Sequence, residues 1–254
     1  MSRYPKENAI LSSFPPGALE LLKPIQREGR RGEVLYEAGD RPDEVCFPLF
    51  GTVTSLIRPM RNGATVEVAL AGFDGFTAIN AILGTTPEVM RVVVQMAGPL
   101  SVVNLERLRE VAAREPRVQT RLMTSIAALV EQVTQTAACN RLHRIEQRLA
   151  KWLLMMWERT GTDDLALTHE FVAHMLGIRR PGVSVALASL SESGLIRHSR
   201  MRVSIRDHGG LEKKACECWG VLRRSLERSL GLVAAGAPEA AGSGRNRALT
   251  THRR

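Results

Sequence analysis

The stretch from Thr168 to Asp207 constrains the fold of this chain more than any other part of its sequence. Two segments with the apolar spacing of a helix, 168–176 and 180–193, flank Gly177. Glycine readily adopts the positive φ that a tight turn requires. Gly194 ends the second segment, and the residues after it predict two short strands. The sequence therefore predicts two short helices joined by a tight turn and followed by a β-hairpin.

Apolar residues give this segment a small core of its own. They lie on one face of each predicted helix and in the turn between them: Phe171, Val172, Met175, Ile178, Val183, Ala186, Leu187 and Leu190. Two helices with a tight turn and a following hairpin form the layout of a winged helix-turn-helix, whose second helix enters the DNA major groove. We therefore predict a DNA-binding unit over residues 140–209, which begins with a further helix from Asn140 to Thr160.

The polar face of the second helix carries residue types that contact DNA. Arginine at the N-terminal end of such a helix can pair with a guanine edge or a phosphate. Two arginines ahead of a helix are by themselves more often solvated surface, but the surrounding layout favours DNA contact. The predicted DNA-binding residues are Thr168, His169, Arg179, Arg180, Pro181, Gly182, Ser184, Val185, and Arg200 and Arg202 of the hairpin.

Residues from about 32 to 105 have the pattern of a β-rich domain. Short apolar runs are separated by turn residues, among them Asn62-Gly63, a pair that marks a hairpin because both residues accept positive φ. Many short strands with regular turns are typical of a sandwich or a barrel. Short helices are expected at 16–25 and 75–83. The strand candidates are 34–36, 45–47, 53–57, 65–69, 92–95 and 100–103.

Between these regions, residues 115–139 predict one long helix with a narrow apolar seam. The seam residues recur in steps of three and four, as in a coiled coil. Such a seam on an otherwise polar helix needs a partner, either the β-rich domain of the same chain or a second copy, and the homodimer is the favoured interpretation. The predicted dimer interface is Val118, Leu122, Ile126, Leu129, Val133 and Ala137.

Charge and composition agree with a DNA-binding protein. The 254-residue chain has a net charge of +9, which favours polyanion partners, although part of this charge lies in an Ala- and Gly-rich tail after residue 232 that we expect to be disordered. Four cysteines are too few for a disulfide scaffold, which favours a reducing cytoplasm. No apolar run reaches the ~20 residues of a membrane span, and no secretory signal is evident, so no membrane partner is expected.

Signals for an enzyme are weak. His169-Glu170 with His174 fails the zinc-protease motif, because the second histidine follows the first by five residues instead of four. No Ser/His/Asp arrangement or carboxylate pair stands out, so no enzymatic activity is predicted.

Two cysteines near the C-terminus, Cys216 and Cys218, leave an alternative open. They could bind a metal or act as a redox switch, but a metal site needs two more donors, and Cys139 and His143 are the only evident ones. Two cysteines on a packed or surface helix are the favoured interpretation. We therefore predict no metal and no cofactor.

Ordered motifs in the second half of the chain resemble the Crp/Fnr superfamily of transcription regulators, and the resemblance extends over residues 8–224. They are Ala-Ala-Cys-Asn-Arg at 137–141, Arg-Leu-Ala-Lys-Trp-Leu-Leu at 148–154, Leu-Thr-His-Glu-Phe-Val-Ala at 167–173, Met-Leu-Gly-Ile-Arg-Arg at 175–180, Gly-Leu-Ile at 194–196 and Cys-Glu-Cys-Trp at 216–219.

This resemblance implies an α+β fold in four parts. These are an N-terminal β-roll (a jelly-roll-like double-stranded β-helix, 1–114) similar to cyclic-nucleotide-binding sensor domains, a dimerisation helix (115–139), a winged helix-turn-helix (140–209), and a last helix with the tail (210–254). It also implies a homodimer on a two-fold DNA operator, with a phosphate contact at Thr168 or His169 and base contacts at or near Arg180, Pro181 and Val185. RNA polymerase is a further candidate partner.

The chain departs from the cyclic-AMP members of that family at the ligand positions. Those members carry a Gly-Glu pair and then an Arg-Ser pair, whereas here Phe76 follows Gly75 and the Arg-Ser positions fall on Val89 and Met90. Arg91 is nearby, but side-chain alternation predicts that it lies on another face of its strand. Cyclic AMP is therefore not expected as the effector, which leaves an unidentified small molecule or none.

Two further departures narrow the prediction. No cysteine precedes Cys46, so the N-terminal iron–sulfur cluster of the oxygen-sensing members is not expected. Pro181 and Val185 replace a Glu and an Arg that contact bases in the cyclic-AMP receptor, which predicts a different operator. The rival function is a small-molecule sensor that acts through protein partners and uses its helix-turn-helix for packing.

Overall fold

The N-terminal strands form two antiparallel sheets, as the short apolar runs predict. The computed structural model describes residues 4–85 and 87–232, and the predicted disordered tail lies outside them. The sheet orders are β1-β7-β3 and β2-β6-β4-β5. The bounds are β1 Ile25–Gly29, β2 Val34–Tyr36, β3 Glu44–Pro48, β4 Val53–Pro59, β5 Thr65–Ala71, β6 Arg91–Met96 and β7 Gly98–Asn104.

All six predicted strands are confirmed, but the helix predicted over residues 16–25 is too long. Helix α1 spans Pro16–Leu22, and Lys23 ends it in the left-handed region at φ 47°. Strand β1 begins at Ile25 and is polar and mostly exposed, so it has no apolar alternation that a sequence pattern could reveal. The short 3-10 helix η1, Leu11–Ser13, precedes α1, and α2 spans Ile79–Ile82 within the predicted 75–83.

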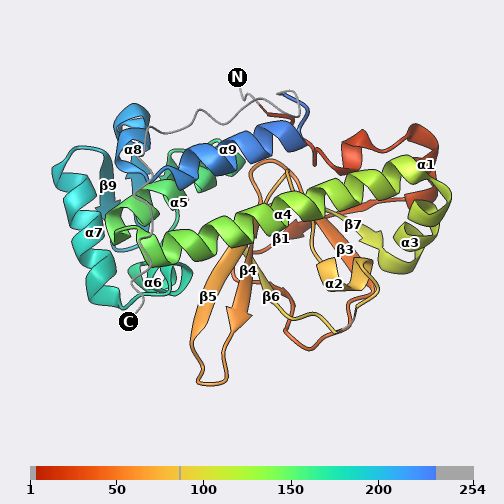
Figure 1. Ribbon diagram of the computed structural model, residues 1–254, viewed down its shortest axis with the longest axis horizontal. Helices are drawn as coiled ribbons and strands as arrows, with labels where there is room; N and C mark the ends of the chain where they lie inside the picture. The colour runs from red at the N-terminus through yellow and green to blue at the C-terminus, as the bar shows by residue number, and fades with distance from the viewer. Residues whose placement is uncertain (1–3, 86, 233–254) are drawn as a thin grey trace, which may run out of the picture.

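Helix α4, Pro116–Leu142, runs along the β-roll and is preceded by α3, Leu105–Arg114, which the sequence did not predict (Figure 1). Gln132 on α4 bonds both backbone groups of Leu70 on the sheet edge at β5. Its Oε1 accepts from the Leu70 N–H at 2.6 Å, and its Nε2 donates to the Leu70 carbonyl at 3.1 Å. The helix therefore satisfies an open edge of the sheet, which would otherwise expose unpaired backbone groups.

The helix predicted from Asn140 to Thr160 is confirmed in most of its length, but it begins later than predicted, because the chain breaks at His143 and Arg144. Helix α4 ends at Leu142, and α5 begins at Ile145 and continues to Thr160. The Arg144 N–H donates to Oε1 of Gln147 at 3.2 Å, which caps the start of α5. No glycine or proline marks this break.

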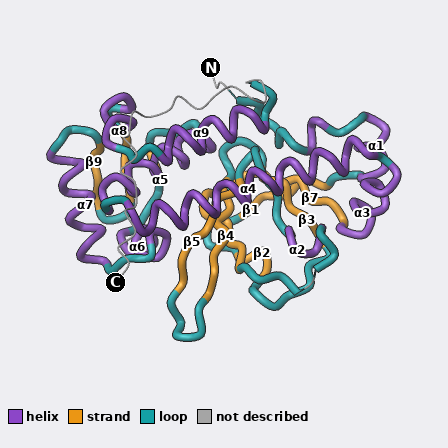
Figure 2. Tube along the Cα trace, viewed as in Figure 1, coloured by secondary structure: helices purple, strands orange, loops and turns teal. Residues whose placement is uncertain are grey.

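The C-terminal half has the predicted winged helix-turn-helix. Its elements are β8 Asp164–Leu165, α6 His169–Leu176, α7 Arg180–Glu192, β9 Ile196–Ser199 and β10 Arg202–Ile205, with the sheet order β8-β10-β9. The single last helix predicted within 210–254 is instead two helices, α8 His208–Lys214 and α9 Cys218–Ser229. Helix α9 returns alongside α4 (Figures 1 and 2). None of the helices in the described part of the chain combines the length and hydropathy of a membrane span.

The β-roll and the DNA-binding unit share one apolar core. Val53, Ile57 and Leu70 of the sheet pack in the same cluster as buried residues of α5, α6 and α7. Two polar links cross the same boundary. The Trp152 indole N–H donates to Glu67 Oε1 at 2.7 Å, and Arg159 pairs with Asp74.

Candidate nucleic-acid interface

Helix α7 has one buried and one exposed face, as its apolar spacing predicts. Val183, Ala186, Leu187 and Leu190 are completely buried, and Val172 and Met175 of α6 pack against them in the same cluster. The predicted contact residues Arg179, Arg180, Pro181, Ser184 and Val185 are exposed on the other face, and Gly182 is half-buried. A rigid apolar core therefore holds this surface outward.

The turn before α7 depends on Gly177. It has φ 61°, and a Cβ built there would lie 3.2 Å from Cγ2 of Val66 on β5. Any other residue would be strained by this φ and crowded by the β-roll. Gly177 therefore sets the angle between α6 and α7 and also permits the close approach of the β-roll.

Arg180 forms an ion pair with Glu170 on α6, and both side chains are more than half exposed. Such a surface pair contributes roughly 0–1 kcal/mol, so a phosphate or guanine can compete for the guanidinium. Arg179 is the N-cap residue of α7 but makes no side-chain cap. The positive N-terminal end of α7 and two arginines thus face outward together, and this arrangement favours binding of an anion such as a phosphate.

Thr168 and His169 lie where α6 meets α7. Thr168 caps α6, because its Oγ1 accepts a hydrogen bond from the Phe171 N–H at 3.1 Å. Nδ1 of His169 lies 3.3 Å from Oγ of Ser184 on α7, and its ring is 5.8 Å from the ring of His198 on β9. His169 therefore connects both helices and the wing.

The β9–β10 hairpin exposes the predicted Arg200 and Arg202. Arg202 lies 3.8 Å from Asp164 of β8, with both side chains more than half exposed. Arg197 and Arg206, which the sequence prediction did not include, are also exposed on this unit. The alternation of buried and exposed residues along β9 could have identified Arg197 as an outward-facing residue from the sequence.

The predicted dimer seam on α4 is wrong at its first two residues. Val118 and Leu122 are 0% and 2% exposed, and they belong to the core of the chain's own β-roll. Ile126, Leu129 and Val133 are partly buried against the same core. The spacing correctly identified a face that needs a partner, but for most of its length that partner is the same chain.

A second stripe on α4 remains exposed. Its residues are spaced by four and three positions: Met123, Ala127, Val130, Thr134 and Ala137. Met123 is 41% and Val130 is 56% exposed. Ala137 is the one member of the predicted seam that belongs to this stripe.

Of the ligand positions discussed above, Phe76 lies inside the β-roll, whereas Val89 is exposed and Met90 is half-buried. Phe76 is buried, and its ring centroid lies 5.6 Å from that of Phe47. Glu88 is also buried, and its Oε1 accepts a hydrogen bond from the Ala81 N–H at 2.8 Å. Burial raises the pKa of Glu88. Arg91 points to Glu37, with its Nε 3.3 Å from Oε1, as the alternation predicted.

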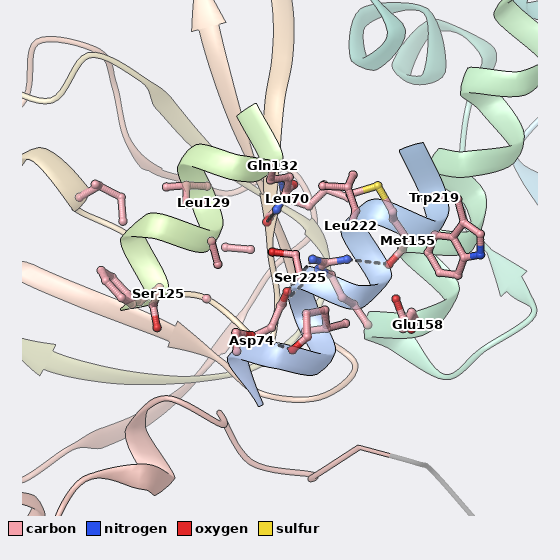
Figure 3. Close-up of a pocket in the computed structure, with 18 residues that line it drawn as sticks. Leu70, Asp74, Ser125, Leu129, Gln132, Met155, Glu158, Trp219, Leu222 and Ser225 are labelled. Carbon is pink, nitrogen blue, oxygen red and sulfur yellow. Dashed lines mark hydrogen bonds and ion pairs between the residues drawn. The ribbon is translucent and has the colours of Figure 1, made fainter. Parts of the chain in front are cut away.

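A cavity of about 50 Å³ lies between the β-roll, α4, α5 and α9. Figure 3 shows Leu129 and Gln132 of α4 facing Leu222 and Ser225 of α9 across it. This volume holds a few water molecules and no nucleotide.

The four residues Cys139, His143, Cys216 and Cys218 come together, although the sequence prediction favoured no metal site. Their donor atoms all lie within 4.8 Å of one another. Hydrogen bonds from the Cys216 and Cys218 thiols lower the pKa of Cys139. The sequence contained all four donors, but it could not show that the two helix breaks bring them together.

Comparison with known proteins agrees with this architecture. Residues 147–214 match the Crp-like helix-turn-helix domain. The chain is 26% identical over 210 residues to the global nitrogen regulator of Synechococcus elongatus. The matched residues cover 78% of this chain and 93% of that protein.

Two solved structures share the fold. A Crp/Fnr-family transcriptional regulator from Eubacterium rectale matches with a TM-score of 0.64 at 17% identity, over 82% of this chain and 99% of the other. FixK2 from Bradyrhizobium japonicum matches with a TM-score of 0.63 at 17% identity, over 76% and 98%.

The helix-turn-helix geometry and the matched domain define the class, and the chain is a DNA-binding transcription regulator. Within that class, residues 147–214 match the Crp-like helix-turn-helix domain, and the β-roll and long helix share the fold of solved Crp/Fnr-family regulators.

Proposed function

We propose that the protein is a homodimer that binds a two-fold operator through α7 and the β9–β10 wing. In this proposal, residues 1–114 form the sensor domain, 115–139 the dimerisation helix, 140–209 the DNA-binding domain and 210–254 the C-terminal helix and tail. The observation that carries it is the exposed, arginine-bearing start of α7, which is held on a fully buried apolar face.

The residues assigned to DNA contact have two roles. Arg179, Arg180, Pro181, Gly182, Ser184 and Val185 of α7 face the major groove, and Arg200 and Arg202 lie near the adjacent backbone. Thr168 and His169 sit at the positive end of α6, where a phosphate is favoured. Their hydrogen bonds to Phe171 and Ser184 support a positioning role in addition.

The dimer forms through the exposed stripe of α4, which packs against the same stripe of a second copy of the chain. The other faces of α4 are already covered, one by the β-roll core and one by α9. The remaining stripe has the alternating four-three spacing of a coiled-coil seam. Pairing there would set two recognition helices about 34 Å apart, one helical turn of DNA.

Cyclic AMP is not the effector in this proposal. Phe76 stands at the position of the ribose-binding carboxylate, and Val89 and Met90 stand at the positions of the Arg-Ser pair, so a cyclic phosphate would lack its guanidinium partner. Any small-molecule effector would therefore act elsewhere, by shifting the population between two arrangements of α4 and the DNA-binding domain. Contact with RNA polymerase, a cytoplasmic location and the absence of enzymatic activity belong to the same proposal.

Selection of bound sequences from random DNA by the full-length protein tests this function. We expect a palindrome whose half-sites are one helical turn apart, bound with an affinity that falls steeply with salt. Equal and weak binding to all sequences would instead support the rival, a sensor that acts through protein partners.

A further inference from the structure

Two helix breaks lie at the same place in space. The first separates α4 from α5 at His143–Arg144, and the second separates α8 from α9 at residues 215–217. Cys139 and His143 are one helical turn apart at the end of α4, and Cys216 and Cys218 flank the second break. Segments more than seventy residues apart in sequence thus contribute two donors each.

The geometry of the four donors fits a metal better than a disulfide. Sγ of Cys139 lies 3.6 Å from Sγ of Cys216, far beyond the S–S bond of about 2.05 Å. Tetrahedral zinc with Zn–S bonds of about 2.3 Å places its sulfur ligands ~3.8 Å apart. The three thiols are buried and His143 is half-buried, so the site is closed.

The groups around the donors also match a metal site. Nδ1 of His143 lies 3.5 Å from Sγ of Cys218, whereas its Nε2 lies 3.0 Å from Oε2 of Glu217. One ring nitrogen therefore faces the sulfurs while the other contacts a carboxylate, the arrangement that orients histidine ligands in zinc proteins. Gln135 donates from its Nε2 to Sγ of Cys218 at 3.0 Å.

Charge is balanced at the same place. Three thiolates and a neutral imidazole around Zn²⁺ leave one negative charge, which a buried site must compensate. Lys151 and Arg148 of α5 are 5% and 7% exposed, and their positive charges act on Cys139.

We propose that Cys139, His143, Cys216 and Cys218 bind one structural zinc ion. Three sulfur donors and one imidazole are a tetrahedral set typical of structural zinc, and no open coordination position is left for a substrate. The thiols release their protons as the metal binds. The ion joins the end of the long helix to the start of α9 and so fixes both helix breaks.

Metal analysis of the purified full-length protein tests this proposal first. We expect about one zinc per chain, released when a mercurial reagent blocks the thiols. Refolding the metal-free protein with Co²⁺ should give the absorption bands of tetrahedral cobalt with thiolate charge transfer. Folded wild-type protein that neither retains nor takes up one equivalent of zinc would overturn the proposal, and so would iron with acid-labile sulfide in its place.

Variants locate the site. The double substitution Cys216→Ser and Cys218→Ser should lower the zinc content at least tenfold, whereas Cys46→Ser, which removes a buried thiol in the β-roll, should leave it unchanged. Equal zinc in all three proteins would overturn the assignment. If the double variant does not fold, the cobalt spectrum of the wild type still decides, because spectra without thiolate charge transfer contradict the proposed ligands.

Discussion

The β-roll and the winged helix-turn-helix use their polar residues in opposite ways. In the β-roll, Glu88 turns inward onto a backbone N–H, and Arg91 pairs with Glu37. In the winged unit, Arg179, Arg180 and Arg200 are exposed around a fully apolar core. In the first region these two side chains contact groups of the same region, and in the second the arginines remain exposed to a partner. The winged unit therefore presents its arginines outward, whereas Phe76 is buried inside the β-roll.

Buried charges lie at the boundary between the two regions. Glu67 and Asp74 belong to the β-roll, and their partners Trp152 and Arg159 belong to α5. Buried polar groups are costly when unpaired, so these links hold the two regions in one arrangement. Changing them tests whether the regions behave as one unit.

The largest effect is expected from Asp74→Ala. Arg159 is almost fully buried, and its Nη2 and Nε contact Asp74 at 2.5 and 3.1 Å. Removing the carboxylate leaves an unpaired buried charge, which should lower the free energy of unfolding by roughly 3–5 kcal/mol. Chemical denaturation measures this loss. The double variant with Arg159→Leu should recover part of it, and an equal or larger loss in the double variant would contradict the explanation.

Glu67 should make stability depend on pH. Burial raises its pKa to about 7, although hydrogen bonds from Ser55 and Trp152 and the charges of Lys151 and Arg159 act in the opposite direction. In the unfolded chain the carboxyl group ionises near its ordinary value of 4.5. The folded protein therefore holds the proton longer, so the free energy of unfolding should fall by about 3 kcal/mol as pH rises through this window and then level off.

Glu67→Gln should remove this pH dependence and make the protein more stable than the wild type at pH above about 7. Denaturation at several pH values measures the slope, and Glu20→Gln, an exposed change on α1, serves as the control. An unchanged slope in Glu67→Gln would show that other groups cause it.

Val130→Glu tests the exposed stripe of α4. A carboxylate in a paired seam would face its own copy across the interface and lose water, which should weaken the dimer by roughly 2 kcal/mol or more. Analytical ultracentrifugation over a concentration series measures the shift. Thr124→Glu, an exposed change on α4 outside the stripe, should leave the dimer intact. A dimer unaffected by Val130→Glu would place the interface elsewhere.

Arg180→Ala should weaken specific DNA binding by roughly 1–3 kcal/mol and relax the preference at one base position. Gel-shift titration on the selected operator measures the change. Arg31→Ala, which removes an exposed arginine of the β-roll, controls for net charge. Undiminished operator affinity would remove Arg180 from the interface.

The smallest effect is expected at the start of α6. Thr168→Ala removes the cap on the Phe171 N–H and should lower the free energy of unfolding by about 1 kcal/mol. Thr168→Ser keeps the hydroxyl group and should behave like the wild type. If Thr168 also contacts a phosphate, Thr168→Ala should lower DNA affinity more than its loss of stability explains, and the serine variant should not.

The sequence by itself determined the elements that local patterns specify. Alternation and turn residues located six strands, and the apolar spacing with Gly177 located the two helices of the DNA-binding unit and their buried face. The same spacing identified the exposed side of α7, because a helix of this period has one face in and one face out.

Tertiary structure decided everything that depends on which surfaces meet. The apolar seam of α4 was correctly located, but contact with the β-roll buries Val118 and Leu122 and leaves Met123 and Val130 for a partner. The sequence predicted a helix boundary at Asn140, near the first break, but no local pattern showed the break beside Cys216 or the meeting of the four donors. Local propensities fix periods and caps, whereas the partner of an apolar face and the meeting of distant side chains depend on the packing of the whole chain.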